Sequence, residues 1–347
     1  MTRKLFVSIL AVVLAICALA GCGSTAQVPA AASDASSPAA AEDTPVTLTL
    51  NHDGSTTHPY QYGSEKLAEL AKEYSNGTIN IEIYPSSQIA SGTKAVEFVQ
   101  MGTLDIALCA STSMVNFVPE TGVIDMPFLF KDKDEVFKIL DGEVGQQLEA
   151  AAEAAGFVIL GWADNGFKCV SNDVHPITCK ADYAGLKIRV PETETFIKMY
   201  EALGAVPTAM AVGEVYTAIQ TGVVSGQDNT VANFVKNKYY EIQSYLTVSN
   251  HIYTAEPYVM STDKFYSLSA NQQDALRRAV KEACEYEREL SLQQDADNIK
   301  IVEEAGVEIT YLSDDAIAEI KEAVQPVYDL NEANYGDTLR KIQEILG

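Results

Sequence analysis

The chain is short of positive charge. Its 347 residues contain 24 Lys and Arg against 48 Asp and Glu, which gives a formal net charge of −24. Such an acidic chain is a poor partner for nucleic acid or for an anionic membrane surface. The overall field also gives a small anion no help, so any anion that binds must be held by a local cation.

The sequence also lacks the common patterns of metal and catalytic sites. Its four His residues are scattered, and it contains no His-x-x-x-His pair, no Cys-x-x-Cys pair, no Gly-x-Ser-x-Gly elbow and no Walker loop. We therefore expect no metal, no cofactor and no enzymatic activity. A pair of acidic residues of the glycosidase type is the exception, because 48 acids leave many possible pairs.

Cysteine is also sparse, with six residues in the chain. Two of them, Cys17 and Cys22, lie near the amino terminus. Cys169 and Cys179 are the closest pair in the rest of the chain, and an exported protein could join them as a disulfide. Buried free thiols are an equally good interpretation, because a core of this size needs no covalent link.

The amino-terminal segment is typical of an export signal. Arg3 and Lys4 precede an apolar run from Leu5 to Ala20, which is shorter than the ~20 residues of a membrane-spanning helix. The run ends in Leu-Ala-Gly-Cys, and small residues before Cys22 resemble a bacterial lipobox. We expect a signal peptide at residues 1–21 and a lipid on Cys22, so that the protein is extracytoplasmic and anchored to the cell membrane.

Residues 22–45 are dominated by Ala, Ser, Pro, Thr and acids, a composition that cannot bury enough surface to fold. They predict a flexible tether. No later apolar run is long enough to cross a bilayer.

Beyond the tether, strand-like and helix-like stretches alternate, which predicts an α/β layered fold. The expected strands cover residues 46–51, 78–84, 104–109 and 157–161, and the expected helices cover residues 60–75, 93–101 and 134–155.

One stretch, Ala270 to Ala305, contains neither Gly nor Pro. Ser269 and Gln272 have the spacing of a capping box, and apolar residues repeat on one face as far as Leu290. At 1.5 Å per residue this helix would be ~50 Å long, more than one small domain needs. It therefore predicts a helix that crosses two lobes.

The segment Gly185–Asn229 carries the strongest functional signal. Alternating apolar residues predict a short strand that ends near Arg189, because Pro191 blocks further pairing. A helix follows and ends at Gly204, and a second short helix ends at Gly222. The run Gly226–Asn229 is predicted to be a turn after another buried strand. Open α/β sheets bind ligands at such strand ends.

The order of these pieces resembles the solute-binding subunits of tripartite ATP-independent periplasmic (TRAP) transporters. The shared pattern is a Gly-Leu-Lys-Ile-Arg-Val-Pro strand, a Gly-Ala-x-Pro-Thr turn, and a Glu-Val-Tyr helix that leads to Gly-Gln-Asp-Asn. The segments YPSSQI at 84–89, NGFK at 165–168 and SNHI at 249–252 extend the resemblance over most of the chain.

The resemblance implies a ligand site. In the family, the Arg that matches Arg189 grips the ligand carboxylate, and the Asn that matches Asn229 contacts the ligand. Lys168 stands where many members have a second Arg, and Val212 stands where an aromatic residue is common. His52, Ser111 and Glu256 are further candidates for ligand contact, although a structural role is the commoner one for such residues.

We therefore expect a two-lobed receptor with a periplasmic-binding-protein-like fold. It would bind a small organic acid, of the sugar acid, sialic acid or dicarboxylate type, and deliver it to the TRAP membrane subunits. The resemblance places lobe I at residues 46–166 and 255–294, and lobe II at residues 167–254 and 295–347. The alternatives are an ABC-type solute-binding lipoprotein and a surface hydrolase that uses an acidic pair.

Overall fold

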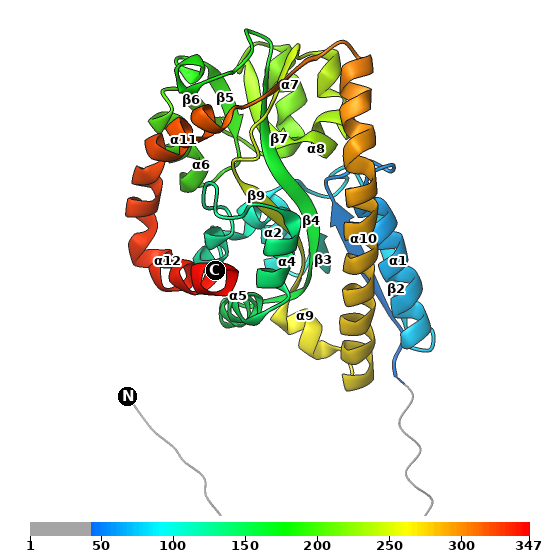
Figure 1. Ribbon diagram of the computed structural model, residues 1–347. Helices are drawn as coiled ribbons and strands as arrows, with labels where there is room; N and C mark the ends of the chain where they lie inside the picture. The colour runs from blue at the N-terminus through cyan, green and yellow to red at the C-terminus, as the bar shows by residue number, and fades with distance from the viewer. Residues whose placement is uncertain (1–42) are drawn as a thin grey trace, which may run out of the picture. The chain divides into compact units, whose positions relative to one another are not determined.

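The computed structural model describes residues 43–347. The expected signal peptide, Cys22 and nearly all of the tether lie outside these residues. Within them, the expected α/β alternation is confirmed (Figure 1). The strands are β1 (Val46–His52), β2 (Ile79–Tyr84), β3 (Ile106–Leu108), β4 (Phe157–Asn172), β5 (Lys187–Val190), β6 (Val206–Ala209), β7 (Gly226–Thr230), β8 (Tyr245–Val248), β9 (Tyr253–Ser261) and β10 (Glu308–Tyr311).

Helices pack against these strands, and most of them lie where the apolar periodicity predicts. They are α1 (Pro59–Tyr74), α2 (Thr93–Gln100), α3 (Ser111–Met114), α4 (Lys133–Leu140), α5 (Glu143–Ala154), α6 (Glu194–Ala202), α7 (Val215–Gln220), α8 (Val231–Lys236), α9 (Thr262–Ser267), α10 (Ala270–Glu304), α11 (Asp314–Ala323) and α12 (Gln325–Leu346), with short 3₁₀ turns η1 (Pro119–Val123), η2 (Lys180–Tyr183), η3 (Val212–Glu214) and η4 (Tyr239–Glu241).

The strands form one hydrogen-bonded path in the order β2-β1-β3-β9-β4-β7-β5-β6, and two further strands lie off this path, β8 paired with β4 and β10 paired with β8. We call β2, β1, β3 and β9 the first half-sheet, and β7, β5, β6, β8 and β10 the second. β4 belongs to both, because its first part pairs with β9 and its last residues, Lys168–Asn172, pair with β7. Figure 1 shows β4 running through the middle of the fold.

The length of β4 corrects the prediction that this strand ends at Gly161. It continues to Asn172 through two register shifts against β9, one between Ile159 and Gly161 and one between Asp164 and Gly166. Gly166 has a φ of 110°, a value that glycine adopts without strain. In the sequence, Gly161 and Gly166 resemble the end of a strand. In the structure, each glycine lies at a register shift, and the strand continues past it.

A second correction concerns residues 134–155, which form two helices instead of one. α4 ends at Leu140, and α5 begins at Glu143 after Gly142. A Cβ atom at Gly142 would lie 2.8 Å from the Lys138 carbonyl oxygen, so the chain needs glycine at this break. Helical periodicity on both sides of the break conceals it in the sequence.

The long helix is confirmed as α10, including the capping box between Ser269 and Gln272. Leu276, Ala279 and Val280 are buried in the core that α10 shares with α1 and the first half-sheet. Val302, near the other end, is buried in a separate core with α7, α8 and β8. Helix α10 therefore crosses both halves of the sheet, as Figure 1 shows.

The carboxy-terminal helix α12 packs on α6 and also on η1, α4 and α5. The residue boundaries of the two lobes remain a prediction. Among residues 43–347, no helix is both long enough and apolar enough to cross a membrane.

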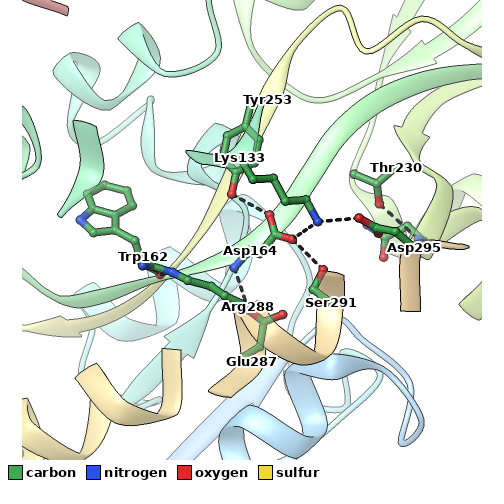
Figure 2. A network of polar contacts seen from close by, with 10 residues as sticks. Lys133, Trp162, Asp164, Thr230, Tyr253, Glu287, Arg288, Ser291 and Asp295 are labelled. Atoms are coloured by element: carbon green, nitrogen blue, oxygen red, sulfur yellow. Dashed lines mark hydrogen bonds and ion pairs between the residues drawn. The ribbon is translucent and has the colours of Figure 1, made fainter. Parts of the chain in front are cut away.

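A buried polar network fixes α10 to β4 at the middle of the fold (Figure 2). Asp164 on β4 accepts hydrogen bonds from the hydroxyls of Tyr253 at 2.7 Å and Ser291 at 2.6 Å. Lys133, the first residue of α4, lies 2.7 Å from the same carboxylate and 2.8 Å from that of Asp295. Four elements, α4, β4, β9 and α10, are thereby joined through one carboxylate.

The backbone of Asp164 is tied to α10 as well. Its N–H donates to the Glu287 carboxyl at 2.8 Å. Burial and the nearby Asp164 raise the pKa of Glu287 well above its ordinary value. Arg288, the next residue of α10, donates to the Trp162 carbonyl and pairs with Asp141 at 2.7 Å. The middle of α10 therefore holds the point where β4 passes from one half-sheet to the other.

We predict that Asp164→Ala lowers the free energy of unfolding by about 3–5 kcal/mol, because it leaves Lys133 without its buried partner. Chemical denaturation measures the change. Asp297→Ala is the matched control, since Asp297 pairs with Lys300 on the exposed face of the same helix. The control should change stability by no more than about 0.5 kcal/mol. Equal effects of the two substitutions would contradict the structural role of the network.

Candidate ligand-binding cavity

A polar cavity lies where the two half-sheets meet. Its wall includes Arg189 and Lys168 as cations, Asp53, Glu192 and Glu256 as acids, and four amides from Asn165, Asn229, Asn233 and Asn237. Tyr60, Met210 and Val212 also line it. Four of the six residues predicted to contact a ligand are therefore brought together, although the sequence separates them by up to 88 positions.

Arg189 lies near the end of β5, as its sequence context predicts, and is 4% exposed. Its Nε and Nη2 atoms donate to the Met210 carbonyl oxygen at 3.0 and 2.7 Å, and Nη1 donates to the Asp228 carbonyl at 3.3 Å. Three of the five guanidinium N–H groups are thus satisfied by backbone. Within residues 43–347, the other two have no acceptor, one on each terminal nitrogen.

Lys168 is the second buried cation, and it is also 4% exposed. Its backbone N–H donates to the Ile252 carbonyl at 2.7 Å, which fixes its place on β4. In the described part of the chain, its ammonium has no hydrogen bond and no ion pair. Burial lowers the pKa of Lys168, and the negative charge of Asp228 opposes this shift.

Burial likewise lowers the pKa of Arg189, with Tyr239 and Asp228 acting against the shift. Neither cation has a carboxylate of residues 43–347 within ion-pair distance. A buried cation without a bonded counter-ion is unfavourable unless an anion joins it. The arrangement is therefore suited to an anion that enters from solvent.

Asn229 corrects a prediction about its surroundings. The run Gly226–Asn229 is not a turn but most of strand β7, which pairs with β4 on one side and β5 on the other. A Cβ at Gly226 would lie 2.6 Å from both Ile188 Cδ1 and the Ser171 carbonyl oxygen. Glycine is needed there for close packing, and not for a turn.

Asp228 lies inside β7, where tertiary partners bind one oxygen of its carboxylate, Oδ2. The Tyr200 hydroxyl donates to it at 2.8 Å, and His251 Nε2 lies 2.7 Å away. The next residue, Asn229, donates to Gln227 Oε1 at 3.3 Å and lines the cavity. Strand β7 thus places one polar side chain behind the site and one in its wall.

Glu256 on β9 lies across the cavity and is 2% exposed. Asn165 donates to it at 2.9 Å and accepts from the Asn233 amide at 3.3 Å. Burial raises the pKa of Glu256 from 4.5 to about 8, so the carboxyl carries a proton at neutral pH. A protonated carboxyl both donates and accepts a hydrogen bond.

His52 and Ser111 do not line the cavity. His52 is buried beside it, with Nε2 lying 3.1 Å from Gln61 Oε1, and Ser111 donates to Asp125 at 3.1 Å. Their sequence neighbours Asp53, Thr112 and Ser113 do line it. Ligand contact by the six residues stays a prediction.

Several lining residues were missed by the sequence analysis. Asp53 directly follows β1, and a polar residue after a strand was a usable signal. Asn165 opens the NGFK segment that drew attention to Lys168. Tyr60, Asn233 and Asn237 lie on or beside helices, and only the packing of these helices brings them to the cavity.

The four cysteines of the described residues, Cys109, Cys169, Cys179 and Cys284, are all free. The alternative of a disulfide between Cys169 and Cys179 is therefore not seen.

Two aromatic residues in or near the NGFK segment lie outside the cavity wall. Trp162 donates to Glu149 at 3.2 Å, and Phe167 packs on Tyr253.

Known proteins resemble this chain over most of its length. The model of bacterial extracellular solute-binding protein family 7 (DctP) matches residues 50–334. The C4-dicarboxylate-binding periplasmic protein DctP of Rhodobacter capsulatus is 33% identical over 297 residues, which cover 84% of this chain and 87% of the relative.

Solved structures give the same result for the fold. A TRAP periplasmic solute-binding protein from Sulfurospirillum deleyianum with bound succinate has a TM-score of 0.83 and 32% identity, over 87% of this chain and 99% of its own. A Sulfitobacter counterpart with bound β-D-galacturonate has a TM-score of 0.82 and 29% identity, over 86% and 99%. The predicted two-lobed α/β fold with a long crossing helix is confirmed.

The raised pKa of Glu256 leads to a pH-dependent prediction. Between pH 4.5 and about 8 the folded state keeps a proton that the unfolded state releases. The contribution of Glu256 to stability is therefore complete below pH 4.5 and is lost as the pH rises toward 8. Glu256→Gln removes this loss. From pH 5 to pH 8, the wild type should lose at least about 1 kcal/mol of unfolding free energy relative to the variant.

Urea denaturation of the ligand-free proteins at both pH values measures this difference. Glu82→Gln makes the same substitution at an exposed position of β2, and its pH slope should match that of the wild type. Parallel slopes for wild type and Glu256→Gln would show that Glu256 is ionised in the folded protein.

Proposed function

The chain belongs to family 7 of the bacterial extracellular solute-binding proteins, the solute-binding subunits of TRAP transporters, and we propose that it binds a small organic acid through Arg189 and Lys168. Members of this family are receptors and not enzymes, which supports a non-enzymatic role. Family membership also decides against the ABC-type receptor. The acid is then delivered to the membrane subunits of a TRAP system.

The observation that carries this proposal is the pair of buried cations in one cavity. Arg189 has two N–H groups left on its terminal nitrogens, and these match the two oxygens of a carboxylate. Hydrogen bonds to a charged group contribute ~1.5–3 kcal/mol each, so a paired contact supplies much of the ~8 kcal/mol of a micromolar affinity. Lys168 adds a second charge, and Asn229 adds an amide.

The relatives support the class of ligand. Succinate is bound in the Sulfurospirillum structure and β-D-galacturonate in the Sulfitobacter structure, and both are organic acids. In our proposal the two lobes close over the acid, and the closed form presents the surface that the membrane subunits recognise. Val212 lines the cavity. The resemblance implies an aromatic residue at this position in many family members, so we expect the ligand to differ from theirs in the part that this residue covers.

The purified protein tests the proposal directly. Denaturing it and analysing the released small molecules by mass spectrometry should yield a carboxylic acid. Calorimetry with that acid, or with succinate and galacturonate if none is released, gives the affinity. Arg189→Ala should weaken binding at least about 100-fold, and Arg189→Lys at least about tenfold, because Lys keeps the charge but loses the paired contact.

Arg340→Ala is the control for loss of one cation, since the Arg340 side chain is 58% exposed on α12. It should leave the affinity unchanged. Circular dichroism should show that the Arg189 variants keep their fold. Normal affinity in folded Arg189→Ala would remove this residue from the site, and the failure of every carboxylic acid to bind would contradict the proposed ligand class.

The anchor is a separate part of the proposal. Residues 1–21 act as a signal peptide, and Cys22 carries a lipid that holds the receptor at the cell membrane. In cells fed a labelled fatty acid, the wild type should be labelled and recovered with membranes. Cys22→Ser should be unlabelled and released in soluble form, while Cys17→Ser, the matched control, should behave as wild type. Label on the Cys22→Ser protein would contradict this assignment.

A further inference from the structure

Four of the five charged residues that line the cavity are sorted by the half-sheet that supplies them, the exception being Glu192, an exposed residue that follows β5. Lys168 lies in the part of β4 that pairs with β7, and Arg189 lies on β5, so both cations belong to the second half-sheet. Asp53 directly follows β1, and Glu256 lies on β9, so both of these acids belong to the first. The cavity therefore has a cationic end and an acidic end.

Asp53 is fixed as a hydrogen-bond acceptor. The Ser87 hydroxyl donates to its Oδ1 at 2.6 Å, and the Gly92 N–H donates to its Oδ2 at 3.3 Å. Both oxygens are held in place, and each keeps acceptor capacity for a further donor. A ligand group next to Asp53 therefore has to supply a hydrogen, as a hydroxyl does.

Glu256 complements Asp53 at the acidic end. The Asn165 amide donates to its Oε2, and the Tyr60 hydroxyl lies close to the same carboxyl group. With its own proton, Glu256 offers one donor and one acceptor, which together match a ligand hydroxyl. A ligand carboxylate would be a third acidic group in the space that Asp53 and Glu256 share, where burial already disfavours negative charge because it raises the pKa of both residues.

The two ends do not neutralise each other directly. Within the described residues, no ion pair joins Asp53 or Glu256 to Arg189 or Lys168, although the charges are near enough to influence one another. A ligand that spans the cavity thus meets cations at one end and hydrogen-bond acceptors at the other. Its two ends must be chemically different.

Building on the proposed function, we propose that the ligand is a hydroxylated monocarboxylic acid and not a dicarboxylate. Its carboxylate binds Arg189 and Lys168, and its remote hydroxyl groups bind Asp53 and Glu256. Asp53 is the residue that selects against a second carboxylate. The preferred class is therefore that of acids whose carbon chain ends in a hydroxyl-bearing carbon.

Matched pairs of acids test this proposal. Galactonate and galactarate, gluconate and glucarate, and erythronate and meso-tartrate differ only at the end remote from the first carboxylate. Calorimetry at pH 7 should show that the hydroxyl-ended acid of each binding pair binds at least about tenfold more tightly. A diacid that binds as tightly as its partner, or more tightly, overturns the proposal and leaves the proposed function intact. If no acid of any pair binds while succinate does, the inference fails alone; if no carboxylic acid binds at all, the proposed function fails as well.

Variants locate the selectivity. Asp53→Asn removes the charge and keeps an oxygen that can accept from Ser87, so the preference for the hydroxyl-ended acid should fall at least about tenfold. Asp274→Asn, the same change on a side chain that is 70% exposed on α10, should leave the preference unchanged. If Asp53→Asn does not fold, Glu256→Gln provides the second test, with weaker binding of the hydroxyl-ended acid. An unchanged preference in a folded Asp53→Asn, or unchanged affinity in Glu256→Gln if only that variant folds, contradicts the proposal.

Discussion

The rest of the site depends on two cations that are buried in one cavity without a bonded carboxylate. Desolvating a charge is costly, and here backbone carbonyls and more distant acids, Asp228 foremost, compensate for it only in part. Asp228 lies behind the cations and is itself held by Tyr200 and His251, so it cannot move to neutralise them. The fold therefore keeps both cations without a bonded carboxylate, and an incoming anion can pair with them.

Strand β4 connects these two cations to the rest of the molecule. Two consecutive residues at the second register shift of β4 bind different groups. Asp164 binds Lys133 and Ser291 (Figure 2). Asn165 joins Glu256 and Asn233 at the cavity. The same crossing point thus fixes α10 and orients the amide that links the two half-sheets across the cavity.

Much of the fold could be predicted because local patterns agree with the final structure. The capping box and the lack of Gly and Pro specify α10, and Pro191 specifies the end of β5 close to Arg189. The errors lie where tertiary packing overrides local preference. Gly226 and Asp228 favour a turn, yet they form a buried strand, because β4 and β5 pair on both sides and Tyr200 and His251 bind Oδ2 of the Asp228 carboxylate.

By itself, the sequence determined the alternating strands and helices, the long helix, and the presence of Arg189 at a strand end, because each depends on neighbours within a few residues. The tertiary structure decided which residues share the cavity. Asp53, Lys168 and Glu256 are far apart in the chain, and only the pairing of β1 with β3, of β3 with β9 and of β9 with β4 brings them together. The polarity of the site, with Arg189 and Lys168 from one half-sheet and Asp53 and Glu256 from the other, follows from that pairing, which no local pattern encodes.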